Sequence, residues 1–128
     1  MSVTVPVSWG ELIDKITILE IKLAKLQDEA ALCNVRKEYE ALCAVRDEAS
    51  SQQGELSGLA AELLDINQTL WTIEDDIRDC ERDGDFGDRF VRLARSVYHT
   101  NDRRAAVKRR INEVMQSEFF EEKSYAAY

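Results

Sequence analysis

The stretch DFGDRFVRLARSVYHTNDRRAAVKRRINEVMQ, residues 85–116, decides the fold. At about 100° per residue, its apolar residues gather on one side of a helix and most of its arginines on the other. This division is typical of an amphipathic helix that packs on a core. The apolar side consists of Phe86, Phe90, Leu93, Val97, Val107, Ile111, Val114 and Met115.

Four polar residues interrupt this apolar side. Thr100, Asn101, Arg104 and Lys108 project onto it at helical spacing. Buried polar groups need hydrogen-bond partners, and buried charges need them more strongly. The sequence therefore predicts that Arg104 and Lys108 meet partners inside the bundle, and the helical pattern leaves open what these partners are.

Length and composition favour one all-helical domain. The chain has 128 residues with one Pro and five Gly, which is enough for a single core and poor in turn formers. No stretch is long and apolar enough to cross a bilayer, and the start MSVTVPVSWGE lacks the pattern of a signal peptide, so we expect a cytoplasmic location. We predict an all-α antiparallel bundle of about four helices with a short extended N-terminal arm.

Capping and turn residues give the expected boundaries. Ser8-Trp9-Gly10-Glu11 matches a capping box, Ser50–Gly54 is a connector, and Asp83-Gly84-Asp85 has turn chemistry. Asp28 is a possible cap for a second helix, but the pattern leaves open whether the chain kinks or reverses there. The single domain 1–128 is divided into an arm at 1–7, helices at 8–27, 29–51, 55–82 and 86–117, and a tail at 118–128.

The net charge of −8 is unevenly distributed along the chain. Residues 54–85 carry ten acids and two bases, whereas residues 86–112 carry two acids and eight bases. The short connection between them makes the two helices antiparallel neighbours, so the acidic helix is expected to lie along the basic one. The overall negative sign argues against a nucleic-acid partner.

The inward polar positions form the candidate site. As a register-fixing network they would satisfy one another inside the bundle. As a ligand site they would hold a small anion, such as a carboxylate or a sugar phosphate. The predicted set is Glu20, Asn67, Glu74, Asn101, Arg104 and Lys108.

Other chemistry has little support in the sequence. Cys33, Cys43 and Cys80 are odd in number and lack metal-ligand spacing, so they are interpreted as reduced thiols. His99 is the only histidine and has no nucleophile at a recognisable spacing. We therefore predict no catalytic residues, no metal site and no cofactor.

The first helix carries apolar residues on two sides. Leu12, Ile16, Leu19, Leu23 and Leu26 follow a coiled-coil-like seam, while Ile18 and Ile21 lie opposite to it. A helix that is apolar on two faces is central or shared with a partner. This pattern predicts a homodimer with Ile18 and Ile21 at the interface, to which the β-branched arm VTVPV would contribute.

Three blocks of the sequence are the most characteristic: VPVSWGELIDKITILEIK (5–22), LWTIEDDIRDCERDGDFGDRFVRLARSVYHTNDRR (70–104) and AAVKRRINEVMQSEFFEEKSY (105–125). Together they resemble a bacterial family of short helical proteins that has no assigned activity. Members tend to be encoded beside, or joined to, glycosyltransferases and other surface-polysaccharide proteins. The resemblance implies a non-catalytic interaction or scaffold role near polysaccharide assembly, with a glycosyltransferase or another polysaccharide-assembly protein as partner. The family's usual Pro after the first helix is absent here, where Glu29 follows Asp28.

The helical pattern also resembles that of the small all-helical chorismate mutases. In those enzymes, Arg and Lys on bundle helices bind a dicarboxylate, and this sequence has the charges without the ordered motif. An enzyme or anion-binding protein that uses the inward cluster is therefore the alternative function.

Overall fold

Four helices account for most of the structure, a computed structural model that describes residues 1–49 and 53–128. They are α1 (Trp9–Lys25), α2 (Glu29–Ala49), α3 (Gln53–Asp83) and α4 (Asp88–Val114). The described residues contain no strand, and the all-α prediction is confirmed. The predicted end of the second helix at residue 51 and most of the 50–54 connector lie outside the described residues.

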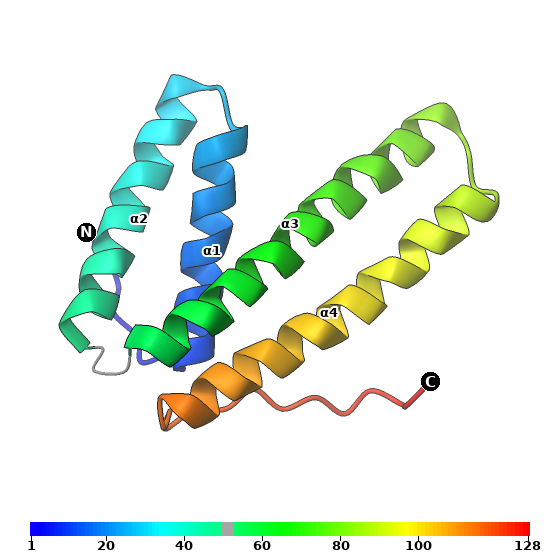
Figure 1. The fold of residues 1–128 in the computed structure, drawn as a ribbon. Helices are drawn as coiled ribbons and strands as arrows, with labels where there is room; N and C mark the ends of the chain where they lie inside the picture. The colour runs from blue at the N-terminus through cyan, green and yellow to red at the C-terminus, as the bar shows by residue number, and fades with distance from the viewer. Residues whose placement is uncertain (50–52) are drawn as a thin grey trace.

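The chain reverses between α1 and α2, which settles the choice that the sequence left open. Leu26 has an extended backbone, and α2 begins three residues later. Asp28 Oδ2 accepts a hydrogen bond from the Ala31 amide at 2.9 Å, as an N-cap carboxylate does. The two helices therefore form an antiparallel hairpin (Figure 1).

A glycine in the turn between α3 and α4 allows the chain to form a second hairpin. Gly84 has φ +68°, in the left-handed region that costs glycine little. The Asp85 amide donates to the Cys80 carbonyl at 2.9 Å, which closes the end of α3 in a Schellman-type turn. The next helix starts at Asp88, so α3 and α4 run antiparallel (Figure 1).

The core lies where α1, α3 and α4 meet. Leu63 and Ile111 are completely buried there, and α2 covers another side of α1 with Tyr39, Leu42 and Cys43. Full burial of such a side chain stabilises the fold by roughly 1.5–3 kcal/mol. The buried cluster is Ile13, Ile16, Leu56, Leu59, Leu63, Ile66, Val107 and Ile111.

One predicted interface residue is internal. Ile21 is only 2% exposed within the single chain, so its assignment to a dimer interface was wrong. Gly10, Asp14, Thr17 and Ile21 recur at 4-3-4 spacing, which puts all four on one side of α1. Asp14 and Thr17 contact α3, so Ile21 continues an inward stripe. Ile18 is half-buried.

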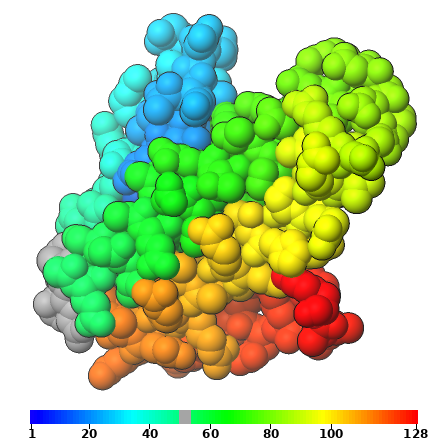
Figure 2. All heavy atoms as spheres, turned by 45° about the vertical axis from the view of Figure 1, so that its right-hand side comes forward, coloured from blue at the N-terminus to red at the C-terminus, as the bar shows by residue number. Residues whose placement is uncertain are grey.

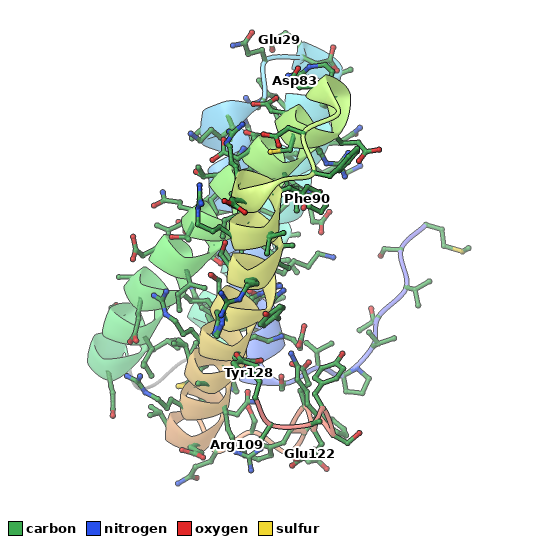
Figure 3. The ribbon with its side chains drawn as sticks, turned by 90° about the vertical axis from the view of Figure 1, so that its right-hand side faces the viewer. Glu29, Asp83, Phe90, Arg109, Glu122 and Tyr128 are labelled. Carbon is green, nitrogen blue, oxygen red and sulfur yellow. The ribbon has the colours of Figure 1, made fainter. Side chains whose placement is uncertain are left out.

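The two ends of the chain behave differently. Residues 1–7 are exposed and non-helical, and they extend away from the helices (Figure 3). The α4 helix ends at Val114 rather than at residue 117, because Gln116 adopts φ +54° and the Ser117 amide donates back to the Asn112 carbonyl at 2.8 Å. Residues 118–128 then return along α4, and Figure 2 shows them in red beside it at the lower right.

Candidate functional site

A buried carboxylate, that of Asp14, connects three helices. Its side chain is 5% exposed and pairs with the guanidinium of Arg104 on α4. Arg104 donates from Nε to Asp14 Oδ1 at 2.9 Å and from Nη2 to Oδ2, which is a bidentate arrangement. Asn67 on α3 donates from Nδ2 to the same Oδ1 at 2.9 Å. Both carboxylate oxygens are therefore satisfied from neighbouring helices.

Thr17 completes this group. Its Oγ1 donates to the Asp14 carbonyl at 2.7 Å and accepts from Asn67 Nδ2 at 2.9 Å. The hydrogen bond to Asp14 raises the pKa of Arg104 above its ordinary value, although burial opposes this. We call Asp14, Thr17, Asn67 and Arg104 the Asp14 network.

Lys108 lies about one turn further along α4 and is held between two carboxylates. Its side chain is 11% exposed and pairs with Glu11 of α1 and Glu121 of the tail, the latter at 3.0 Å from Nζ to Oε2. Burial alone would lower the pKa of Lys108, but the hydrogen bonds to Glu11 and Glu121 outweigh it and the pKa is raised. The same ammonium lowers the pKa of Glu121 against the opposing effect of burial.

The first turn of α1 is capped from two directions. Ser8 Oγ accepts from the Glu11 amide at 3.2 Å, as the capping box predicts. The Gly10 amide donates to Asn112 Oδ1 at 2.6 Å, and the Trp9 amide donates to Ser117 Oγ at 3.0 Å. Three amides that a helix N-terminus leaves without intrahelical partners are thus satisfied by side chains.

Gly10 allows this close approach of α1 to α4. A Cβ atom at residue 10 would lie 2.7 Å from the Lys108 carbonyl oxygen and 2.9 Å from Asn112 Oδ1. Any other residue would push the two helices apart. The Gly10 contact, the Lys108 pair and the Arg104 pair follow one another along the interface, and they show that α1 and α4 are antiparallel.

The structure brings only part of the predicted polar set together. Asn67, Arg104 and Lys108 face α1, and Asn101 is half-buried one turn before Arg104. Glu20 lies elsewhere, beside Arg46 in a cavity of about 390 Å³ between α1 and α3. Burial raises the pKa of Glu20, and the charge of Arg46 opposes this shift.

The prediction that Glu74 points inward was wrong. Its side chain is 57% exposed and pairs with Arg78 on the next turn of α3 at 2.7 Å. Ile73 is buried at the neighbouring position. Glu74 is therefore on the solvent side of the seam, where it forms a helix-surface ion pair.

Sequence reasoning missed the carboxylates that serve as partners. Glu11 was predicted only as part of the capping box, and Asp14 and Glu121 were not predicted as partners. The signal in the sequence is the 4-3-4 spacing of Gly10, Asp14, Thr17 and Ile21, in which small and polar residues occupy an apolar stripe. Asn112 is also buried, at 3% exposure, and was not singled out.

The site consists of ion pairs and amide hydrogen bonds between side chains of the protein. Across residues 1–49 and 53–128, no three His, Cys, Asp or Glu side chains are grouped as a metal ion would require. Within the same residues, none of the helices has the length and apolarity to span a membrane.

The comparison with family models assigns the chain at the level of family. The model described as a family of unknown function, DUF6165, matches residues 3–128. The chain belongs to this family. The match includes the Asp14 network, the α1 cap and the tail that contacts Lys108. No curated protein and no solved structure matches the chain.

Proposed function

We propose that this protein is a non-catalytic helical interaction or scaffold protein. The observation that carries the proposal is that both inward cations already have partners within the chain. Arg104 is bound by Asp14, and Lys108 by Glu11 and Glu121. Such a network fixes which helix faces meet, as buried polar groups do in other bundles.

The same contacts bear on the alternative, a small-anion site or a chorismate-mutase-like enzyme at Arg104 and Lys108. A carboxylate or sugar phosphate would have to compete with carboxylates of the chain itself. An Arg104→Met variant separates the two functions. If this variant keeps the fold and its melting temperature but loses binding of a dicarboxylate that the wild type binds, the ligand function replaces the scaffold function.

We extend the proposal to a partner in surface-polysaccharide assembly, such as a glycosyltransferase, and this step rests on the family resemblance. The test is a pull-down from native cells followed by mass spectrometry, with an unrelated helical bundle as the control bait. Specific recovery of a glycosyltransferase or another polysaccharide-assembly protein would support it. An unchanged surface-glycan profile after deletion of the gene would count heavily against it.

We also propose that the protein is a homodimer that uses the Ile18 side of α1 and the exposed valines of the arm. Wild type and an Ala24→Asp control, which changes an exposed residue of α1, should sediment at twice 14.7 kDa at micromolar concentration. Ile18→Asp should shift the mass toward that of one chain. A wild type that sediments at 14.7 kDa would contradict the dimer.

A further inference from the structure

Three adjoining cavities lie between α4 and residues 118–128. Their volumes are about 250, 50 and 970 Å³, and successive cavities share lining residues, so they form one groove that the tail partly covers. We call this groove the α4 trough. Its α4 side includes Tyr98, Asn101, Arg104, Lys108, Arg109 and Asn112.

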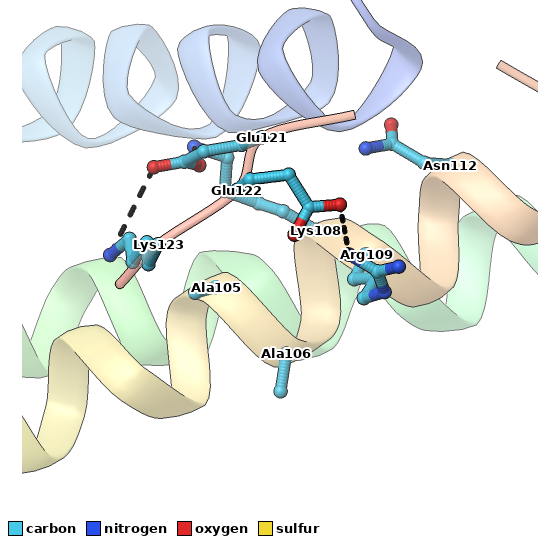
Figure 4. A pocket seen from close by; sticks show the side chains of 8 residues that line it. All are labelled: Ala105, Ala106, Lys108, Arg109, Asn112, Glu121, Glu122 and Lys123. Atoms are coloured by element: carbon cyan, nitrogen blue, oxygen red, sulfur yellow. Dashed lines mark hydrogen bonds and ion pairs between the residues drawn. The ribbon is translucent and has the colours of Figure 1, made fainter. Parts of the chain in front are cut away.

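One end of the α4 trough is cationic and holds two consecutive carboxylates of the tail. Glu121 pairs with Lys108 at 3.0 Å. Glu122 pairs with Arg109 at 3.3 Å, which a dashed line marks in Figure 4. The guanidinium of Arg109 also lies 5.4 Å from the ring centroid of Phe120. This end therefore recognises an acidic pair next to an aromatic ring.

The other end is aromatic, and the tail does not fill it. The Tyr128 ring lies 5.3 Å from that of Tyr98 and 4.8 Å from that of His99, and its hydroxyl donates to Asp102. The cavity of about 970 Å³ is at this end, bordered by Val97, Ala126 and Ala127. The two alanines contribute little apolar surface, so a segment with larger side chains would bury more.

Side chains alone hold the tail in place. Among the residues that the structure describes, the backbone of 118–128 makes no hydrogen bond to another backbone group. The ion pair of Arg109 with Glu122 is 51% and 77% exposed, and exposed pairs contribute little to stability. Tyr125 and Tyr128 are 83% and 73% exposed. A competing segment that supplies its own carboxylates to Lys108 and Arg109 can therefore displace the tail at small cost.

We propose that the α4 trough is the docking surface for an extended segment of a partner protein, and that residues 118–128 occupy it as an internal competitor. The segment would carry two adjacent carboxylates followed by bulky apolar or aromatic side chains. Its carboxylates would replace those of Glu121 and Glu122, and its apolar residues would fill the cavity beside Ala126 and Ala127. This inference rests on the proposed interaction function and names the chemistry of the partner.

The test measures binding of a labelled peptide of residues 118–128 to the full-length protein by fluorescence anisotropy. The tail variant combines Glu121→Gln, Glu122→Gln and Tyr128→Ala, which removes the ion pairs of the tail with Lys108 and Arg109 and the contacts of Tyr128, and leaves the α4 side of the trough unchanged. We expect its Kd for the peptide to be about tenfold lower than that of wild type, because three weak internal contacts no longer compete. The control Glu118→Gln, at an exposed position without an ion pair among the described residues, should bind as wild type does.

Two further comparisons locate the binding. A peptide with Leu in place of Ala126 and Ala127 should bind the tail variant more tightly than the native peptide. Arg109→Gln, added to the tail variant, should weaken binding, whereas Arg103→Gln on an exposed side of α4 should not. Equal Kd values for wild type and tail variant, or no saturable binding to the tail variant, would overturn the proposal.

Sedimentation distinguishes a partner from a second copy. If wild type is a dimer and the tail variant a monomer, the occupant is the tail of another copy and the partner assignment is overturned. The peptide assay does not depend on which protein the pull-down recovers. Failure of the assay alone rejects the trough, and failure of the pull-down alone rejects the polysaccharide role.

Discussion

At the scale of single residues, the arrangement of α1, α3 and α4 depends most on Asp14. Its carboxylate is buried and receives donors from Arg104 on α4 and Asn67 on α3. A buried ion pair is weak evidence for stability as such, but removing one partner leaves a charge without compensation. The Asp14 network therefore acts chiefly by penalising every other arrangement of the three helices.

Arg104→Ala should lower the free energy of unfolding by about 2–4 kcal/mol, because it strands the Asp14 carboxylate in a nearly dry site. The exposed neighbour Arg103→Ala should change it by less than about 0.5 kcal/mol. Urea denaturation monitored by circular dichroism measures both. An Arg104→Ala variant as stable as Arg103→Ala would mean that water reaches Asp14 and that the network fixes nothing.

Gly10→Ala should destabilise the protein by about 1–3 kcal/mol, since a methyl group has no room against α4. The matched control is Gly58→Ala in α3, where no atom of the described residues outside that stretch of helix lies within 4 Å of the added carbon. That change should leave stability unchanged or raise it by up to about 1 kcal/mol, through helix propensity. Thermal melts should therefore show a lowered melting temperature for Gly10→Ala and not for Gly58→Ala.

The inward direction of Arg104 and Lys108 was predictable from helical phase, but their partners were not. Phase is a property of one helix, whereas pairing depends on how far two helices slide along each other. The approach at Gly10 sets this offset for α1 and α4, and nothing in the local sequence states it. The prediction for Glu74 was wrong for the same reason. Whether a residue that flanks a seam turns inward or outward depends on which helix packs beside it.

At the scale of elements, α1 is the central helix. It packs on α2 through one side and on α3 and α4 through the Asp14 side, so the burial of Ile21 needs no second chain. The sequence located all four helices from seams and caps. The end of α4 differs because Gln116 adopts a left-handed backbone, which residue type alone does not favour.

The tail contact predicts a dependence on pH. Lys108 lowers the pKa of Glu121 in the folded protein, so this contact stabilises the fold above the ordinary carboxyl pKa of 4.5 and is lost as the pH falls through the lowered value. Glu121→Gln should therefore be less stable than wild type at pH 7, and the difference should vanish at low pH. Urea titrations of both proteins across this range measure it; a difference independent of pH would show that the charge is not involved.

At the scale of the whole molecule, two antiparallel hairpins share a core at one end. The α1–α2 hairpin and the α3–α4 hairpin diverge toward their turns (Figure 1). The antiparallel all-α arrangement followed from the short turn at Gly84 and the charge pattern. The predicted pairing of acidic α3 with basic α4 is present in the ion pair of Glu62 with Arg110 at 3.2 Å.

Two of the cysteines lie in different parts of this arrangement, so the reactivity of their thiols probes each part separately. Cys33 on α2 is exposed, whereas Cys80 near the turn of α3–α4 is completely buried. A thiol reagent should modify Cys33 at once and Cys80 only when the hairpin opens, so Cys80 reactivity should rise with urea. Mass spectrometry of the labelled peptides gives both rates. Equal rates in the native protein would show that the distal hairpin is open in solution.

The hydrogen bond from Trp9 to Ser117 spans 108 positions of the sequence. It places the start of α1 beside the end of α4, so the two ends of the helical part of the chain are neighbours in space. The order in which the helices follow one another along the sequence is then of minor importance for the fold. A circular permutant that joins residues 128 and 1 by a flexible linker and opens the chain beside Gly84 should still assemble the same four helices, with a native circular dichroism spectrum.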